Sequence, residues 1–177
     1  MSVASPFGTI GPYFPSEFSN GTNDLTNKGA ARGRKITLTG TVVEEGGKPT
    51  FNTIIEVWQA DSNGIFRHPL DERASEADPN FQGWGRDRTD EHGRYAFHTV
   101  VPGALEGRQP HINVMILAIG LTRRLVSTIF FANATDPVLD CVPPESRERL
   151  VARQTGDGEY EFNIILRGEN ETPFFED

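Results

Sequence analysis

The stretch KITLTGTVVE, from Lys35 to Glu44, decides the fold. Ile36, Leu38 and Gly40 alternate with threonines, and a period of two is typical of a β-strand with one buried face. The pair Gly46-Gly47 follows shortly afterwards, and glycine adopts the backbone angles that a chain reversal needs. The stretch therefore predicts a half-buried strand that ends in a turn.

Five further segments along the chain have a similar character, since each is rich in the β-branched or aromatic residues that favour strands. Clusters of Asn, Asp and Gly separate several of them and indicate turns. Because strand and turn alternate in this way, we predict an all-β fold, a β-sandwich with long loops. The five segments are TIIEVWQA (Thr53 to Ala60), GRYAFHTVV (Gly93 to Val101), HINVMILAIG (His111 to Gly120), RLVSTIFFA (Arg124 to Ala132) and EYEFNIILR (Glu159 to Arg167).

Three other segments lack strand periodicity. Residues 1–34 are rich in Gly, Pro, Ser and Asn, and predict an irregular N-terminal arm that is loose unless it docks on something. The segment from Arg67 to Arg88 is charged and contains two prolines, so we expect a long loop that serves an interface or a site. PESRERLVAR, which begins at Pro144, predicts one short helix because proline is favoured at a helix start.

Length and composition exclude several classes of protein. A chain of 177 residues predicts a single domain over residues 1–177. With 17 Lys and Arg against 25 Asp and Glu, the formal charge is -8, so we expect no nucleic-acid partner. The chain has one cysteine, Cys141, no signal-like start and no run of about 20 apolar residues. We therefore predict a soluble, cytoplasmic protein without a membrane partner.

Four sequence blocks, in fixed order, resemble the intradiol ring-cleavage dioxygenases, and the ending GENETPFF (Gly168 to Phe175) agrees with them. The resemblance implies a β-sandwich in which two tyrosines and two histidines hold a non-haem ferric ion. It also implies an activity, the cleavage of an aromatic diol between its two hydroxyl carbons by O2. The blocks are TIGPYFP (Thr9 to Pro15), IEVWQADSNG (Ile55 to Gly64), FQGWGRDRTDEHGRYAFHTVVPG (Phe81 to Gly103) and PHINVMI (Pro110 to Ile116).

This chain departs from the family at the positions of the iron ligands. Phe66 stands where the first tyrosine is expected, and Leu105 where the second is expected. The two histidines of the family form an H-x-H, of which this chain retains His111 but has Asn113 in the second place. Phenolate oxygens favour Fe(III), and their loss removes that preference. The resemblance thus implies four vestigial ligand positions, no metal site and no catalytic residue in this chain.

The same departures are similar to the iron-free α chains of heteromeric members of the family, which act beside an iron-bearing β subunit. That similarity implies a hetero-oligomer of αβ units with Fe(III) bound by the β subunit, acting on protocatechuate or a related catechol to give 3-carboxy-cis,cis-muconate. It further implies that Thr9, Gly11, Pro12 and Tyr13 line the partner's substrate pocket. Gly11 permits close approach and Pro12 fixes its own backbone angle. The plainer alternative is that the arm is only a terminal tether.

Two questions stay open at the level of the sequence. Related α chains carry an arginine for the substrate carboxylate where this chain has Ile119, so Arg123 or Arg124 compensates, the partner supplies the charge, or the preferred diol differs. The plainer interpretation of His111 is a hydrogen-bonded core residue, in preference to a catalytic one. The alternative to the enzyme subunit is a metal-free β-sandwich binding module, which would not need an obligate partner or a large apolar interface.

Overall fold

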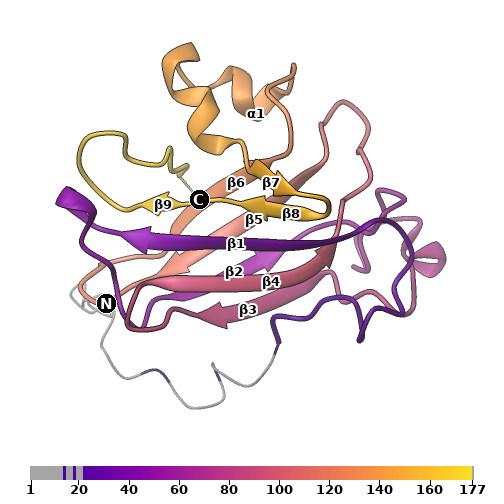
Figure 1. The fold of residues 1–177 in the computed structure, drawn as a ribbon. Helices are drawn as coiled ribbons and strands as arrows, with labels where there is room; N and C mark the ends of the chain where they lie inside the picture. Colours follow the sequence, from indigo (N-terminus) through magenta and orange to yellow (C-terminus); the bar gives the residue numbers. More distant parts are fainter. Residues whose placement is uncertain (1–13, 15–17, 19–21, 177) are drawn as a thin grey trace, which may run out of the picture.

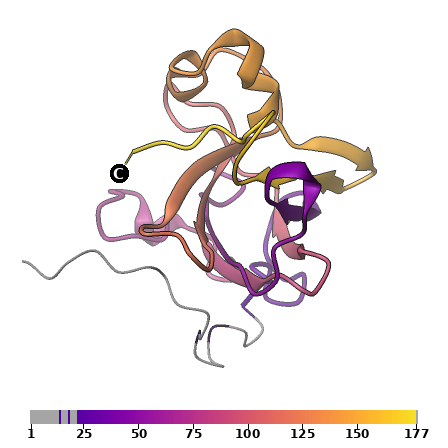
Figure 2. The same cartoon turned by 90° about the vertical axis from the view of Figure 1, so that its left-hand side faces the viewer.

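The computed structural model describes Phe14, Phe18 and residues 22–176, and two β-sheets dominate it (Figure 1). The first sheet has the strand order β4-β1-β8-β7, with β9 also paired to β1, and the second has the order β3-β2-β5-β6. The sheets form two layers (Figure 2), which confirms the predicted β-sandwich. The bounds are β1 Lys35–Val43, β2 Ile54–Trp58, β3 Trp84–Arg88, β4 Arg94–Val100, β5 His111–Leu117, β6 Leu125–Phe130, β7 Arg153–Gly156, β8 Glu159–Glu161 and β9 Ile164–Ile165.

The predicted alternation along β1 is confirmed. Ile36, Leu38, Gly40 and Val42 are buried, while the threonines between them lie on the other face. Gly40 is required by close packing, since a Cβ at this position would lie 1.9 Å from the carbonyl oxygen of Phe162. No larger residue fits there without moving the neighbouring backbone.

The main core lies between the two sheets and consists of side chains that alternate along the strands. Full burial of a Leu, Ile or Phe side chain contributes about 1.5–3 kcal/mol relative to its exposure, so these residues hold the layers together. They include Ile36, Leu38, Val42, Tyr95 and Phe97 from the first sheet and Ile55, Val57, Ile112, Val114, Ile116 and Ile129 from the second.

A smaller apolar cluster lies beneath the helical segment, and its members are Phe130, Leu139, Val142 and Leu150. The α-helix α1, Pro137–Asp140, begins after Asp136, whose side chain accepts the N–H of Val138. The sequence predicted the short helix at a different place, from Pro144 onward. That segment is instead a 3-10 helix, Pro144–Leu150.

The helix predicted from Pro144 ends early because its last residues pair with β6. Val151 is extended, with φ -103° and ψ 120°, and forms a parallel bridge with Phe130. The N–H of Ala152 donates to the carbonyl of Phe130 at 2.8 Å. Among the described residues, no helix is long and apolar enough to cross a membrane.

The segment predicted as one strand from Glu159 to Arg167 is two short strands. Both β8 and β9 run parallel to β1, and Asn163 lies between them. Its side-chain oxygen accepts the N–H and the hydroxyl of Thr41, both at 2.9 Å, in place of a continuous strand pairing. β7 was not predicted, and it pairs with β8 with an irregularity between Gln154 and Gly156.

β3 lies inside the long loop predicted from Arg67 to Arg88, so that prediction was wrong for the last five residues. Its sequence WGRDR has no apolar alternation, because β3 is the edge strand of the second sheet. Gly85 faces another segment of the chain, and a Cβ there would lie 2.5 Å from Cδ1 of Leu25. An edge strand covered in this way needs little apolar surface of its own.

Residues 22–25 join the edges of the two sheets. On β3, the N–H of Arg86 donates to the carbonyl of Thr22 at 3.2 Å, and the hydroxyl of Thr22 donates back to the carbonyl of Arg86 at 3.1 Å. On β4, the carbonyl of His98 accepts the N–H of Leu25 at 2.8 Å. Thr22 therefore lies at the β3 edge.

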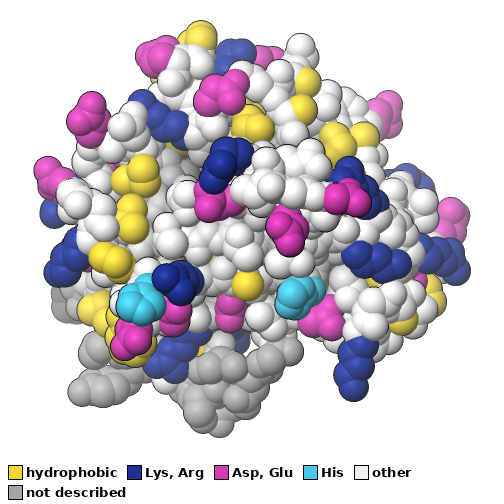
Figure 3. All heavy atoms as spheres, in the orientation of Figure 1, with side chains coloured by type: hydrophobic (Ala, Val, Ile, Leu, Met, Phe, Trp, Pro, Cys, Tyr) yellow, Lys and Arg dark blue, Asp and Glu magenta, His cyan; other side chains and the backbone are white. Residues whose placement is uncertain are grey.

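At the opposite edge of the second sheet, the C-terminal segment lies against β6. The N–H of Phe175 donates to the carbonyl of Val126 at 2.8 Å, and the hydroxyl of Ser127 donates to the carbonyl of Pro173, also at 2.8 Å. Figure 3 shows the exposed face of the first sheet. Acidic, basic and neutral polar side chains are interspersed on this face, and hydrophobic side chains occur only in small groups.

Asp87 also links the two sheets, since its carboxylate accepts the N–H of Ala96 on β4 at 2.8 Å. Burial raises the pKa of Asp87 above its usual 3.8, although backbone N–H donors act in the opposite direction. A carboxyl group whose pKa is raised by folding contributes stability below its unfolded pKa and loses that contribution as the pH rises through the folded value.

We expect Asp87→Asn to stabilise the chain at neutral pH, because the amide oxygen still accepts the N–H of Ala96 without a buried charge. The melting temperatures of variant and wild type should be close at pH 3 and should separate as the pH rises above 3.8. Thermal unfolding by circular dichroism from pH 3 to pH 7 measures this difference. A difference that does not change with pH would contradict the raised pKa.

Candidate functional site

Two turns carry the first two positions that the sequence predicts to be vestigial ligand positions, residues 61–66 with Phe66 and residues 102–105 with Leu105. These turns are in direct contact. Gly64 has φ +73°, and a Cβ on it would lie 2.3 Å from the carbonyl oxygen of Ala104. Only glycine permits this approach, so residue 64 fixes how close the two turns lie.

Asp61 holds this pair of turns together from within. It is buried, and its carboxylate accepts the N–H groups of Asn63 at 2.8 Å, Ile65 at 3.1 Å and Asp78 at 2.9 Å. Its main-chain carbonyl accepts the N–H of Gly103 at 2.8 Å. One residue thus connects the first turn, the second turn and the long loop.

The remaining vestigial positions lie next to these turns on the second sheet. The ring of Phe66 is 5.1 Å from the ring of Trp58, measured between centroids. Trp58 is the register partner of Asn113 on β5, and His111 lies two residues earlier on the same face. The carbonyl of Leu105 accepts the N–H of Arg108 at 3.0 Å, in the chain that precedes β5.

The side chain of His111 is held in place by a hydrogen bond and by ring packing within the protein. Its Nδ1 lies 2.7 Å from the carbonyl oxygen of Gln109, and since a carbonyl only accepts, Nδ1 carries the proton and only Nε2 keeps a lone pair. Burial lowers the pKa of His111, and the charge of Arg108 lowers it further, although the bond to Gln109 acts in the opposite direction. The ring packs 6.0 Å from that of Phe130. These contacts are those expected of a core histidine, which is one of the interpretations of His111 that the sequence left open.

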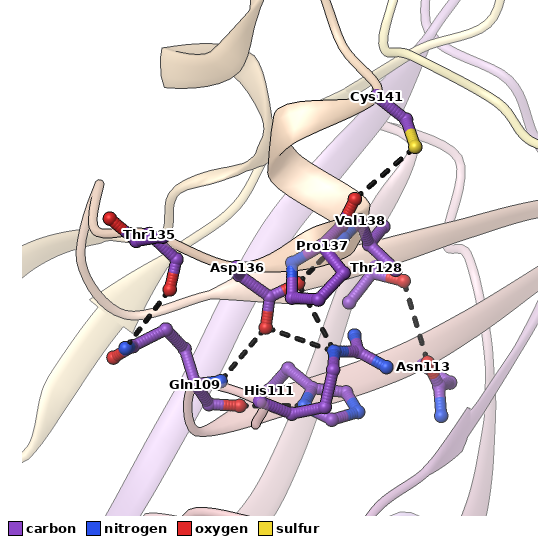
Figure 4. A network of polar contacts seen from close by, with 10 residues as sticks. Gln109, His111, Asn113, Thr128, Thr135, Asp136, Pro137, Val138 and Cys141 are labelled. Carbon is purple, nitrogen blue, oxygen red and sulfur yellow. Dashed lines mark hydrogen bonds and ion pairs between the residues drawn. The ribbon is translucent and has the colours of Figure 1, made fainter.

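A buried carboxylate, Asp136, organises the chain around His111, and the sequence analysis missed it (Figure 4). It accepts Nε of Arg108 at 2.9 Å and the N–H groups of Gln109 and Val138, both at 2.8 Å. Burial alone would raise the pKa of Asp136, but these donors together lower it. The sequence signal was present, because Asp followed by Pro is typical of a helix start.

The donors at the four ligand positions do not fit ferric iron. Phe66 and Leu105 have no oxygen, Asn113 offers a neutral amide and His111 a single nitrogen. The amide oxygen of Asn113 lies within 3.4 Å of the Thr128 hydroxyl, which donates to it. Across Phe14, Phe18 and residues 22–176, no group of three or more His, Cys, Asp or Glu side chains could hold a metal ion.

The predicted substrate-pocket residues Thr9, Gly11, Pro12 and Tyr13 lie outside the described residues, so their role stays a prediction. The described residue nearest to them in the sequence is Phe14.

The face of the second sheet that points away from the core, the outer face, is apolar and partly exposed. Trp58 and Trp84 are register partners on β2 and β3 and are 43% and 40% exposed. A hollow of about 340 Å³ lies over this face, and a second, of about 560 Å³, lies beside it and shares Trp58. The first is lined by Glu56, Val57, Trp58, Trp84, Asn113, Val114, Met115 and Val126.

Residues 9–168 match the family model described as "Dioxygenase". Over 197 aligned residues the chain is 33% identical to the protocatechuate 3,4-dioxygenase α chain of Pseudomonas putida, an alignment that covers 97% of this chain and 96% of that one. This chain belongs to the intradiol dioxygenase family. The resemblance drawn from the four sequence blocks, including that to the α chains, is therefore confirmed.

Other members of the family are similar along most of their length. The protocatechuate 3,4-dioxygenase β chain of Burkholderia cepacia is 39% identical over 170 aligned residues, which cover 86% of this chain and 72% of that one. Among solved structures, the dioxygenase domain of a dioxygenase carbohydrate-binding fusion from Streptomyces sp. SirexAA-E superposes with a TM-score of 0.63 at 25% identity, covering 95% of this chain and 98% of that one. The chain is thus similar to both subunit types of a two-chain enzyme.

We expect the triple variant Phe66→Tyr, Leu105→Tyr and Asn113→His to bind Fe(III), because the paired turns and His111 already supply the frame. Iron analysis after loading with Fe(III), together with a visible tyrosinate-to-iron absorption band, measures binding. Asn113→His alone is the matched control and should stay colourless, since it adds no phenolate. A triple variant that folds but remains colourless would show that these positions are not the family's ligand positions.

Proposed function

We propose that this chain is the α subunit of a protocatechuate 3,4-dioxygenase and that a homologous β subunit holds the Fe(III). The observation that carries the proposal is the absence of any donor atom at Phe66 and Leu105 in a chain that otherwise matches the family from residue 9 to residue 168. The complex would cleave the bond between the two hydroxyl carbons and add both atoms of O2, so that each carbon becomes a carboxyl group. Protocatechuate would give 3-carboxy-cis,cis-muconate.

The outer face of the second sheet is the surface that best suits the β subunit. Tryptophans are enriched at the energetic centres of protein interfaces, and Trp58 and Trp84 lie side by side there. Leu70, at the adjoining hollow, is 87% exposed. The occupant we propose is the iron-bearing chain, because the relatives include both an α and a β chain of the same enzyme.

The contribution of this chain would be a wall of the substrate pocket. Thr9, Gly11, Pro12 and Tyr13 precede Thr22, where the chain meets the β3 edge. The five residues from Thr9 to Tyr13 reach at most roughly 18 Å when extended, which is enough to enter the pocket of an adjoining subunit. In that position they would exclude water from the reacting diol.

The substituent that the enzyme accepts on the aromatic ring of its substrate depends on which residue can pair with a carboxylate there. Ile119 is 49% exposed and follows the end of β5 opposite to His111, so it offers no charge to a carboxylate there. Arg123 and Arg124, in the same connection to β6, are exposed and could take that role if the partner's pocket extends to them. The single-domain organisation and the cytoplasmic location stay predictions.

The second candidate, a metal-free binding module, is favoured by the hollow over the outer face, whose size suits a small apolar ligand. The two candidates differ in their need for a partner. A module would bind its ligand without a second chain, whereas an α subunit requires the iron-bearing chain for any turnover.

Co-expression with a protocatechuate 3,4-dioxygenase β chain should yield a complex that contains iron and consumes O2 with protocatechuate. The chain purified by itself should contain no iron and consume no O2. Iron analysis and an oxygen electrode measure both preparations, with the β chain alone as the control. Iron and turnover in the lone chain would overturn the proposal, and a chain that never joins the β subunit would favour the binding module.

Trp58→Ala should weaken association with the β subunit by about 10-fold to 100-fold, because truncating a central interface aromatic costs roughly 2 kcal/mol or more. Phe51→Ala is the matched control, since Phe51 is 58% exposed but precedes the opposite end of β2. Analytical ultracentrifugation of the reconstituted complexes measures the dissociation constants. Equal losses for both variants would argue against the outer face as the docking surface.

A further inference from the structure

Arg86 joins the outer face of the second sheet to the start of the chain. Its Nε donates to a carboxylate oxygen of Glu56 at 2.7 Å, and a second guanidinium nitrogen bonds to the same oxygen. Both side chains are less than one-fifth exposed, at 19% for Arg86 and 16% for Glu56. Its backbone bonds to Thr22 in both directions, as described above. The plane of the guanidinium group is therefore fixed.

Aromatic rings lie against this guanidinium group. Its central carbon is 3.9 Å from the centroid of the Phe18 ring and 5.0 Å from that of Trp84. The Phe18 ring in turn stacks on Phe14, with 5.9 Å between centroids and 28° between planes. Trp84, Arg86, Phe18 and Phe14 form a series of contacts from β3 to the N-terminal segment, which we call the aromatic stack.

We propose that the aromatic stack anchors the N-terminal arm and that Arg86 is the positioning residue for the TIGPY segment. Phe14 directly follows Tyr13, so the stack ends one residue from the segment that would line the partner's pocket. The proposal rests on the function proposed above, in which Thr9, Gly11, Pro12 and Tyr13 form a pocket wall. Arg86 touches neither substrate nor iron, and it acts through Phe18 and Phe14.

The chemistry of arginine explains why this residue suits the role. A planar guanidinium group can hydrogen-bond in its plane to Glu56 and present its faces to Phe18 and Trp84 at the same time. A lysine ammonium would keep the ion pair but offers no plane to stack on. An arm that is already fixed before the partner docks also loses less conformational freedom on binding, which favours a well-defined pocket wall.

The first test uses the lone full-length chain and needs no activity. In Arg86→Lys, and separately in Phe18→Leu, chymotrypsin should cleave after Tyr13 about threefold to tenfold faster than in wild type. Mass spectrometry of the released peptides gives the rates, and the melting temperature checks that the body is unchanged. Arg94→Lys, on the exposed side of β4, is the matched control and should cleave at the wild-type rate.

The second test uses the iron-containing complex. Each single variant should raise KM for protocatechuate about threefold to tenfold, with kcat and iron content near wild type, because the iron site itself is untouched. The double variant Arg86→Lys with Phe18→Leu should be no worse than either single one, since both remove the same contact.

The outcomes separate this proposal from the one on which it rests. Unchanged cleavage rates in the lone chain would overturn the anchor, whatever the complex does. Faster cleavage with an unchanged KM would overturn the positioning role. Failure of the proposed function itself would appear earlier, as a wild-type complex that contains no iron or consumes no O2.

Discussion

The whole fold depends on the pairing of β1 with its neighbours. This strand bonds to β4 on one side and to β8 and β9 on the other, and β7 is attached through β8. The arrangement requires residue 40 to have no side chain, because the carbonyl of Phe162 occupies that space. Once β1 is in place, its alternate residues cover the inner face of the second sheet. The two turns that carry Phe66 and Leu105 then follow the ends of β2 and β4.

The frame around the vestigial ligand positions is stable without an ion. Asp61 accepts backbone N–H groups from both turns. Asp136 accepts the backbone N–H of Gln109, before β5, and that of Val138, in the first turn of α1. His111 has its own hydrogen bond and ring contact. A site whose ligands depended on metal for their position would collapse on losing it. Here protein groups hold both turns, so the surrounding structure does not require an oxygen donor at Phe66 or Leu105.

Local patterns in the sequence predicted β1, β2, β4, β5 and β6, because β-branched and aromatic residues follow one another there. They could not predict β3, where WGRDR becomes a strand only because Leu25 and β2 flank it, nor the break at Asn163, which depends on a bond to Thr41. The vestigial ligand positions are implied by the resemblance of the motifs to the family and stay a prediction. The contact between Arg86 and Phe18 joins residues far apart in the chain, and no short pattern contains it.

The way in which the sheet edges are covered affects how copies of this chain can contact one another. Residues 22–25 cover β3 and β4, and the segment around Phe175 covers β6. Within the described part of the chain, these segments leave uncovered only β7, which is four residues long with an irregular register, and the two-residue β9. Short, irregular edges are poor templates for additional strands. The described part of the chain therefore offers little edge along which copies could polymerise.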